Sequence, residues 1–97
     1  MRAIFIDASV TELKKNYLAI ADYFKAHDPN FEVLFLTVDT ASYVVPTMEE
    51  DAQKLITEKG YKIDHFTSFN RKKIRTKLQE VKPDYILIDQ FAERGIY

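Results

Sequence analysis

Four short hydrophobic runs, separated by segments of helical length, constrain the fold of this chain more than any other feature. They fall at residues 3–6, 31–37, 61–66 and 85–88. Three of them lack the polar–apolar alternation of half-exposed strands, which is typical of strands covered on both faces in a parallel sheet. The segments between them carry hydrophobic residues at helical spacing. Right-handed crossovers through these helices then predict an α/β fold, a three-layer Rossmann-like parallel sheet.

The third run differs from the others and sets the predicted strand order. Lys62 and Asp64 alternate there with Ile63 and His65, so this strand should have one face in water and lie at an edge. The order along the sheet is then 3-2-1-4, with a reversal of connection between strands 1 and 4. The apolar fourth strand forms the other edge. Exposed apolar edges favour pairing, so we expect either that a partner chain covers this edge, for example by self-association, or that the chain is the start of a longer polypeptide.

Helix boundaries are marked by capping patterns. Residues 9–12 and 47–50 match the Ser/Thr-x-x-Glu capping box, which satisfies free amides at a helix start. Ser68 or Asn70 would cap a third helix over residues 71–81, and Gly60 suits the left-handed position after the second helix. The chain is one domain, residues 1–97, which we expect to be the N-terminal fragment of a larger protein.

Composition argues against several functional classes. The net charge of −1 by itself predicts neither nucleic-acid binding nor membrane binding. The absence of cysteine excludes disulfides, thiolate metal sites and a cysteine nucleophile. No run is apolar enough for a leader or a membrane span, so we expect a cytoplasmic location. Residues 7–12 contain no glycine, whereas dinucleotide-binding turns need three, so we expect no bound cofactor.

Polar residues stand in the sequence beside the ends of the predicted strands. Asp7, Asp39 and Asp89 each follow an apolar strand, and Ser9 and His65 lie close to strand ends. Ligands bind outside these ends in open parallel sheets. The three carboxylates could hold Mg²⁺ in a metal-dependent hydrolase or nuclease, and the first strand with its aspartate is somewhat similar to the opening of a PIN-type nuclease. Aspartate also follows strands simply because it turns the chain. We therefore predict these five residues as crevice candidates without a metal.

Five cations in seven residues open the predicted third helix, namely Arg71, Lys72, Lys73, Arg75 and Lys77. Cations oppose the dipole at a helix start, so helix stability does not account for them. Together with free amides they would bind an anion, such as the phosphate of a polyphosphate acceptor or of an anionic lipid. The first four form the predicted anion and acceptor site. The alternative is an ordinary solvated helix face.

Several segments together resemble the N-terminal Rossmann-like half of a GT-B-fold transferase. They are residues 4–7, residues 16–20 with the helix end at 27–30, residues 31–36, and the Lys-Pro-Asp opening of the last strand at 82–89. The family that the chain resembles is the CDP-glycerol glycerophosphotransferases, the teichoic-acid type of glycosyl and glycerophosphate transferases. The resemblance covers most of the chain and lies mainly in residues that build the fold.

That resemblance implies transfer of glycerol phosphate or a sugar from a CDP- or UDP-activated donor to a membrane-linked acceptor. It implies that a C-terminal domain of the same polypeptide holds the nucleotide, and that the present chain faces the acceptor at the inner face of the membrane and is inactive alone. No catalytic residue is carried over. A third alternative is a non-catalytic binding or regulatory module of receiver-like or flavodoxin-like type. The single acid after strand 1, Asp7, and the lack of a fifth strand count against it.

Overall fold

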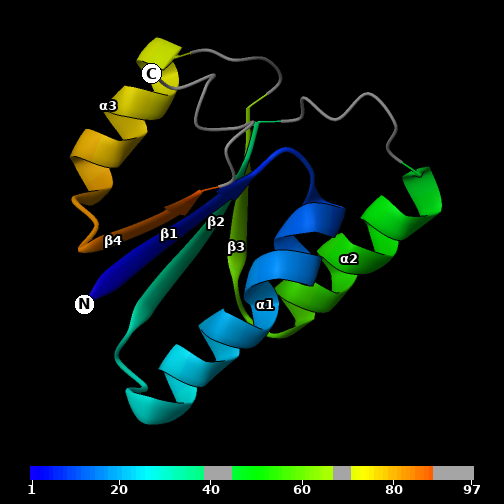
Figure 1. The fold of residues 1–97 in the computed structure, drawn as a ribbon, viewed down its shortest axis with the longest axis horizontal. Coiled ribbons are helices and arrows are strands. Elements are labelled where there is room, and N and C mark those ends of the chain that lie inside the picture. The colour runs from blue at the N-terminus through cyan, green and yellow to red at the C-terminus, as the bar shows by residue number, and fades with distance from the viewer. Residues whose placement is uncertain (39–44, 67–70, 89–97) are drawn as a thin grey trace.

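Strands and helices alternate along the chain in a computed structural model of the protein, which describes residues 1–38, 45–66 and 71–88 (Figure 1). The elements are β1 (Arg2–Asp7), α1 (Val10–His27), β2 (Glu32–Thr37), α2 (Pro46–Glu58), β3 (Lys62–His65), α3 (Arg71–Val81) and β4 (Tyr85–Ile88). The strands are parallel and follow the order β3-β2-β1-β4. The predicted α/β class and the predicted strand order are therefore confirmed.

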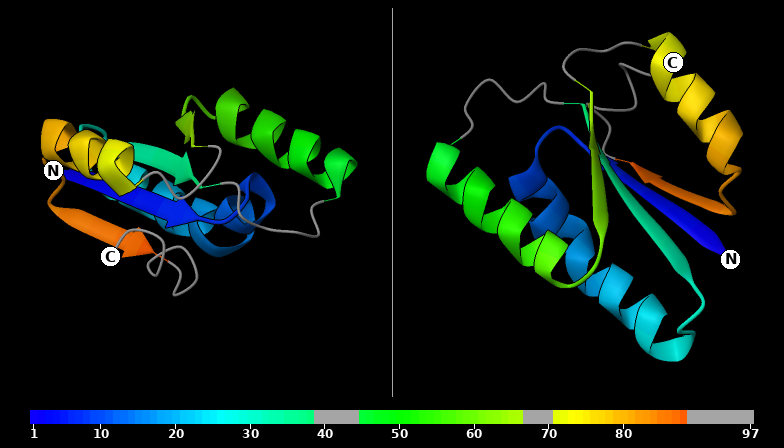
Figure 2. Two further views of the ribbon diagram at one scale, coloured as in Figure 1. Left: turned by 90° about the horizontal axis from the view of Figure 1, so that it is seen from above. Right: turned by 180° about the vertical axis from the view of Figure 1, so that it is seen from behind.

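Helices cover both faces of the sheet, which gives the three layers. Figures 1 and 2 show α1 and α2 on one side and α3 on the other. On the first face, the rings of Phe5 and Phe35 stack with their centroids 5.4 Å apart within one buried cluster. On the second face, Ile74 of α3 is fully buried against Ile6 and Leu36. Alternate residues of β1 thus contact different helices, as the strand pleat requires.

The two ends of α2 show one wrong prediction and one correct prediction. The expected cap at Thr47 is wrong, because α2 begins at Pro46 and its N-cap, Val45, makes no side-chain capping bond. Proline at the first helical position has no N–H to satisfy and a preset φ, so a side-chain cap is less needed. The other end matches the prediction for Gly60, which has φ +88°. Its amide donates to Thr57 O at 3.0 Å and the Tyr61 amide donates to Ile56 O at 3.4 Å, the two bonds of a Schellman motif.

The two edge strands lie where the sequence predicted, but β3 does not have the predicted single face in water. Its exposed residues are Lys62 and His65, which are three positions apart and so lie on opposite faces, whereas Asp64 is half-buried. Within the described residues, β4 pairs only with β1, and its Tyr85 and Ile86 side chains remain 48% and 42% exposed. An apolar strand edge therefore lies at the surface of the described part of the chain.

Candidate functional site

The turn from β1 into α1 holds a buried, hydrogen-bonded carboxylate at the carboxyl edge of the sheet. Asp7 is the last residue of β1 and is only 2% exposed. Its carboxylate accepts from the Ala8 amide at 2.7 Å and from Asn16 Nδ2 at 3.0 Å. Asn16 also donates to Glu12 at 3.3 Å, so Asp7 is tied to the first turns of α1. These bonds give Asp7 a structural role in turning the chain.

Ser9 is the N-cap of α1, as its sequence pattern predicted. Its hydroxyl is nearly buried and accepts from the Glu12 amide at 3.2 Å. Its carbonyl accepts from the Leu13 amide at 3.1 Å, which begins the regular helical ladder. Asp7 and Ser9 are thus brought together at one turn.

The remaining crevice candidates do not join this turn in the described structure. His65 is exposed at the end of β3, level with Thr37 of β2, and so lies two strands away from β1. Asp39 and Asp89 lie outside the described residues. Among residues 1–38, 45–66 and 71–88, no group of three His, Cys, Asp or Glu side chains could hold a metal ion. The three-carboxylate metal site therefore stays a prediction.

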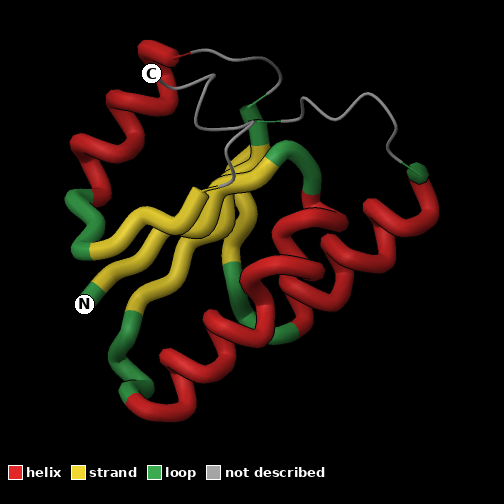
Figure 3. The backbone as a smooth tube through the Cα atoms, viewed as in Figure 1, coloured by secondary structure: helices red, strands yellow, loops and turns green. Residues whose placement is uncertain are grey.

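Glu49, in the first turn of α2, makes the contact at this turn that the sequence patterns did not predict. Its carboxylate crosses to the start of α1, where it accepts from the Val10 amide at 3.1 Å and from the Thr11 amide at 2.6 Å. The two helices lie side by side, which brings Glu49 within reach (Figure 3). The Ser9 hydroxyl accepts from the Glu12 amide. Side-chain oxygens therefore accept hydrogen bonds from the amides of Val10, Thr11 and Glu12, which have no acceptor within the helix.

The charge of Glu49 suits this position. Burial raises the pKa of its carboxyl group, but hydrogen bonds from Thr11 and Val10 outweigh burial, and the pKa lies below its usual value. A carboxylate is also stabilised by the positive end of the α1 dipole. A second anion at the same place would find no free amide among these three and would be repelled by Glu49. The start of α1, where Rossmann-type domains bind phosphate, is therefore closed.

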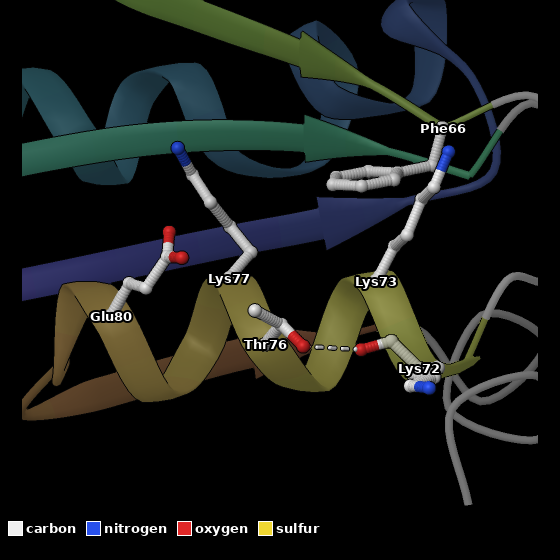
Figure 4. Close-up of a pocket in the computed structure, with 6 residues that line it drawn as sticks. All are labelled: Phe66, Lys72, Lys73, Thr76, Lys77 and Glu80. Atoms are coloured by element: carbon white, nitrogen blue, oxygen red, sulfur yellow. Dashed lines mark hydrogen bonds between the residues drawn. The ribbon is translucent and has the colours of Figure 1, made fainter.

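The predicted anion site on α3 is only partly assembled. Lys72, Lys73 and Arg75 are exposed, and Arg71 begins the helix. Helical spacing distributes these residues around the axis, because consecutive positions are 100° apart. Lys72 and Lys73 line one hollow, together with Phe66, Thr76, Lys77 and Glu80 (Figure 4). Arg75 does not line it, because its position falls on another side of the helix.

A second polar cluster joins α1 and α2 and has a structural role. Asp22 accepts from Lys59 Nζ and from the Tyr61 hydroxyl, both at 2.7 Å. The hydrogen bond from Lys59 is the largest influence and lowers the pKa of Asp22. Burial, then the hydrogen bond to Asp22 and the negative charge of Asp22, raise the pKa of Tyr61. These contacts connect α1 to the end of α2.

Scans of the sequence and the structure against protein-family models, curated proteins and solved structures gave no match. None of the helices in the described ranges combines the length and the apolar character that a membrane crossing requires.

Proposed function

We propose that this chain is the N-terminal, acceptor-side half of a GT-B-fold transferase that moves glycerol phosphate or a sugar from a nucleotide-activated donor to an acceptor. The observation that carries the proposal is that the first backbone amides of α1 already have hydrogen-bond acceptors within the chain. A Rossmann-like domain that binds its own nucleotide uses these amides for the phosphates. Glu49 and Ser9 hold them here. The donor nucleotide is then bound by a second domain of the same polypeptide, and the present chain does not catalyse transfer alone.

The connection into β4 also supports the proposal, since it contains the Lys-Pro-Asp segment of the family resemblance. Lys82 has φ +51°, and its amide donates to Leu78 O at 3.0 Å, so the chain leaves α3 sharply. The Asp84 carboxylate then accepts from the Arg2 amide at 2.8 Å, and the Asp84 amide donates to Arg2 O at 2.9 Å. These bonds fix the start of β4 beside β1. The segment of the family resemblance thus helps to place β4 beside β1 in the sheet.

The proposal includes partners and a location. The acceptor of such a transferase is linked to the membrane, so the chain would work in the cytoplasm at the inner face of the membrane. The cationic residues of α3, with Lys72, Lys73 and Arg75 exposed, support contact with an anionic surface or a polyphosphate acceptor.

Acceptor binding and catalysis can be tested separately on the purified chain. Calorimetric titration with a glycerol-phosphate oligomer should show binding. Incubation of the chain with CDP-glycerol and the same oligomer should release no CMP, because the donor site is on another domain. Release of CMP by the chain alone, or failure of the oligomer to bind, would contradict the proposal.

A further inference from the structure

Positive charge is concentrated on α3. Its 11 residues hold five cations and one carboxylate, a surplus of four positive charges, in a chain whose net charge is −1. The rest of the chain therefore carries a surplus of five negative charges. An anion is repelled by most of the molecule and attracted to α3. The charge distribution therefore favours an anionic ligand and favours its binding at this helix.

A hollow of about 490 Å³ lies beside α3 within this region of positive charge. That volume is in the range of small-molecule sites, roughly 300–1,000 Å³. In the view of Figure 4, Lys73 and Lys77 extend from α3 with the Phe66 ring between their ends. The Lys77 ammonium is held by Asp64 of β3 at 3.0 Å, which leaves its hydrocarbon stem as part of the wall. The hollow thus combines apolar walls with ammonium groups.

The two ends of the hollow differ in charge. Lys72 and Lys73 belong to the first turn of α3, at the positive end of the helix dipole and near the carboxyl edge of the sheet. Glu80 lines the hollow at the other end, roughly 10 Å further along the helix axis from Lys73. An anionic group is therefore favoured at the Lys72 and Lys73 end. The remainder of a ligand would lie against Phe66 and the Lys77 stem, which favour an apolar body.

We propose that this hollow binds a phosphate monoester with an apolar body, with the phosphate at Lys72 and Lys73 and the body against Phe66. The ligand is either a free amphiphile or a lipid whose phosphate is presented by a membrane, since both have this chemistry. The further step of identifying this ligand with the acceptor of the transferase rests on the proposed function. Binding in the hollow does not require it.

The test uses farnesyl monophosphate as the probe, with inorganic phosphate for comparison, in calorimetric titrations of the full chain. Farnesyl monophosphate should bind the wild type more tightly than inorganic phosphate does. The double variant Lys72→Gln with Lys73→Gln should lower its affinity about 30-fold, because each cation near an anionic group contributes about a factor of five. Phe66→Leu should weaken farnesyl monophosphate binding and leave inorganic phosphate binding unchanged.

The matched control is Lys14→Gln with Lys15→Gln, an adjacent exposed lysine pair on α1, on the other face of the sheet. It makes the same change in net charge and should bind like the wild type. A second arm measures sedimentation with phosphatidylglycerol–phosphatidylcholine vesicles, and dependence on Lys72 and Lys73 there identifies a membrane lipid as the source. An equal loss of farnesyl monophosphate affinity in the Lys72 and Lys73 variant and in the Lys14 and Lys15 variant would overturn the proposal. Failure of both farnesyl monophosphate and inorganic phosphate to bind would also overturn it. If only this test fails while the glycerol-phosphate oligomer still binds, the proposed function stands.

Discussion

Replacing Glu49 with alanine should destabilise the protein without removing any buried hydrophobic contact. Glu49 accepts from the amides of Val10 and Thr11, so the variant leaves two amides at the start of α1 to water. Loss of a capping acceptor costs about 0.5–2 kcal/mol, and loss of a negative charge near a helix N-terminus costs a further ~0.3–1 kcal/mol. We expect the free energy of unfolding to fall by about 1–3 kcal/mol. The urea midpoint should then fall by roughly 1 M.

The control for this experiment is Glu50→Ala, the exposed neighbour in the same helix, which should leave the free energy of unfolding within about 0.5 kcal/mol of the wild-type value. Glu49→Gln keeps an acceptor and loses the charge, so it should fall between the wild type and Glu49→Ala. Urea unfolding followed by circular dichroism measures all four proteins. Equal midpoints for Glu49→Ala and Glu50→Ala would refute the closed helix start.

The same contact should make stability depend on pH in a defined direction. The folded-state pKa of Glu49 is lowered from an ordinary value of 4.5. Because the folded-state pKa is lowered, the stabilisation that the Glu49 carboxylate gives to the folded state is fully present above the unfolded-state pKa. It is lost as the pH falls through the folded-state pKa. The difference in stability between wild type and Glu49→Ala should therefore be constant near neutral pH and should narrow as the pH falls below the ordinary value of 4.5.

Three further predictions concern the helix pair and the sheet edge. Tyr61→Phe removes the hydrogen bond to Asp22 and should lower the free energy of unfolding in urea by about 1 kcal/mol. An unchanged urea midpoint would show that this bond does not stabilise the fold. Leu87→Asp should destabilise the fold, because it places a charge against the core cluster that contains Phe5 and Phe35. Leu87 is only partly buried and lies on an edge strand, so part of the charge can reach water. Full wild-type stability of the variant would contradict this packing. Self-association through the exposed apolar edge should appear in light scattering as a mass that rises with concentration and should be abolished by Ile86→Lys. A constant monomer mass would exclude that association.

The sheet could be predicted because its signals are local and agree with one another. The apolar runs, the polar alternation around Lys62 and Asp64, and the helical spacing between them all indicate one topology. The start of α2 could not be placed correctly, because Thr47 and Glu50 form a capping pattern while Pro46 is an equally good helix start. A sequence pattern alone does not decide between two such local solutions.

The candidate site was less predictable than the fold, since its main contact is tertiary. Glu49 appears in the sequence as an acid suited to the start of its own helix, and only the packing of α1 against α2 brings it to Val10 and Thr11. The lysines of α3 were visible as a cluster in the sequence. Their division around the helix, with Lys73 in the hollow and Arg75 outside it, follows from which face Ile74 buries.

The central claim is that the start of α1 is closed to nucleotide phosphates and that the donor is bound elsewhere. An amide NMR titration of the purified chain with CDP-glycerol tests it directly. We predict that the amide resonances of Val10, Thr11 and Glu12 do not move at millimolar donor, because Glu49 and Ser9 hold those groups. Saturable shifts of these three resonances would contradict the claim and would make this chain the nucleotide-binding domain.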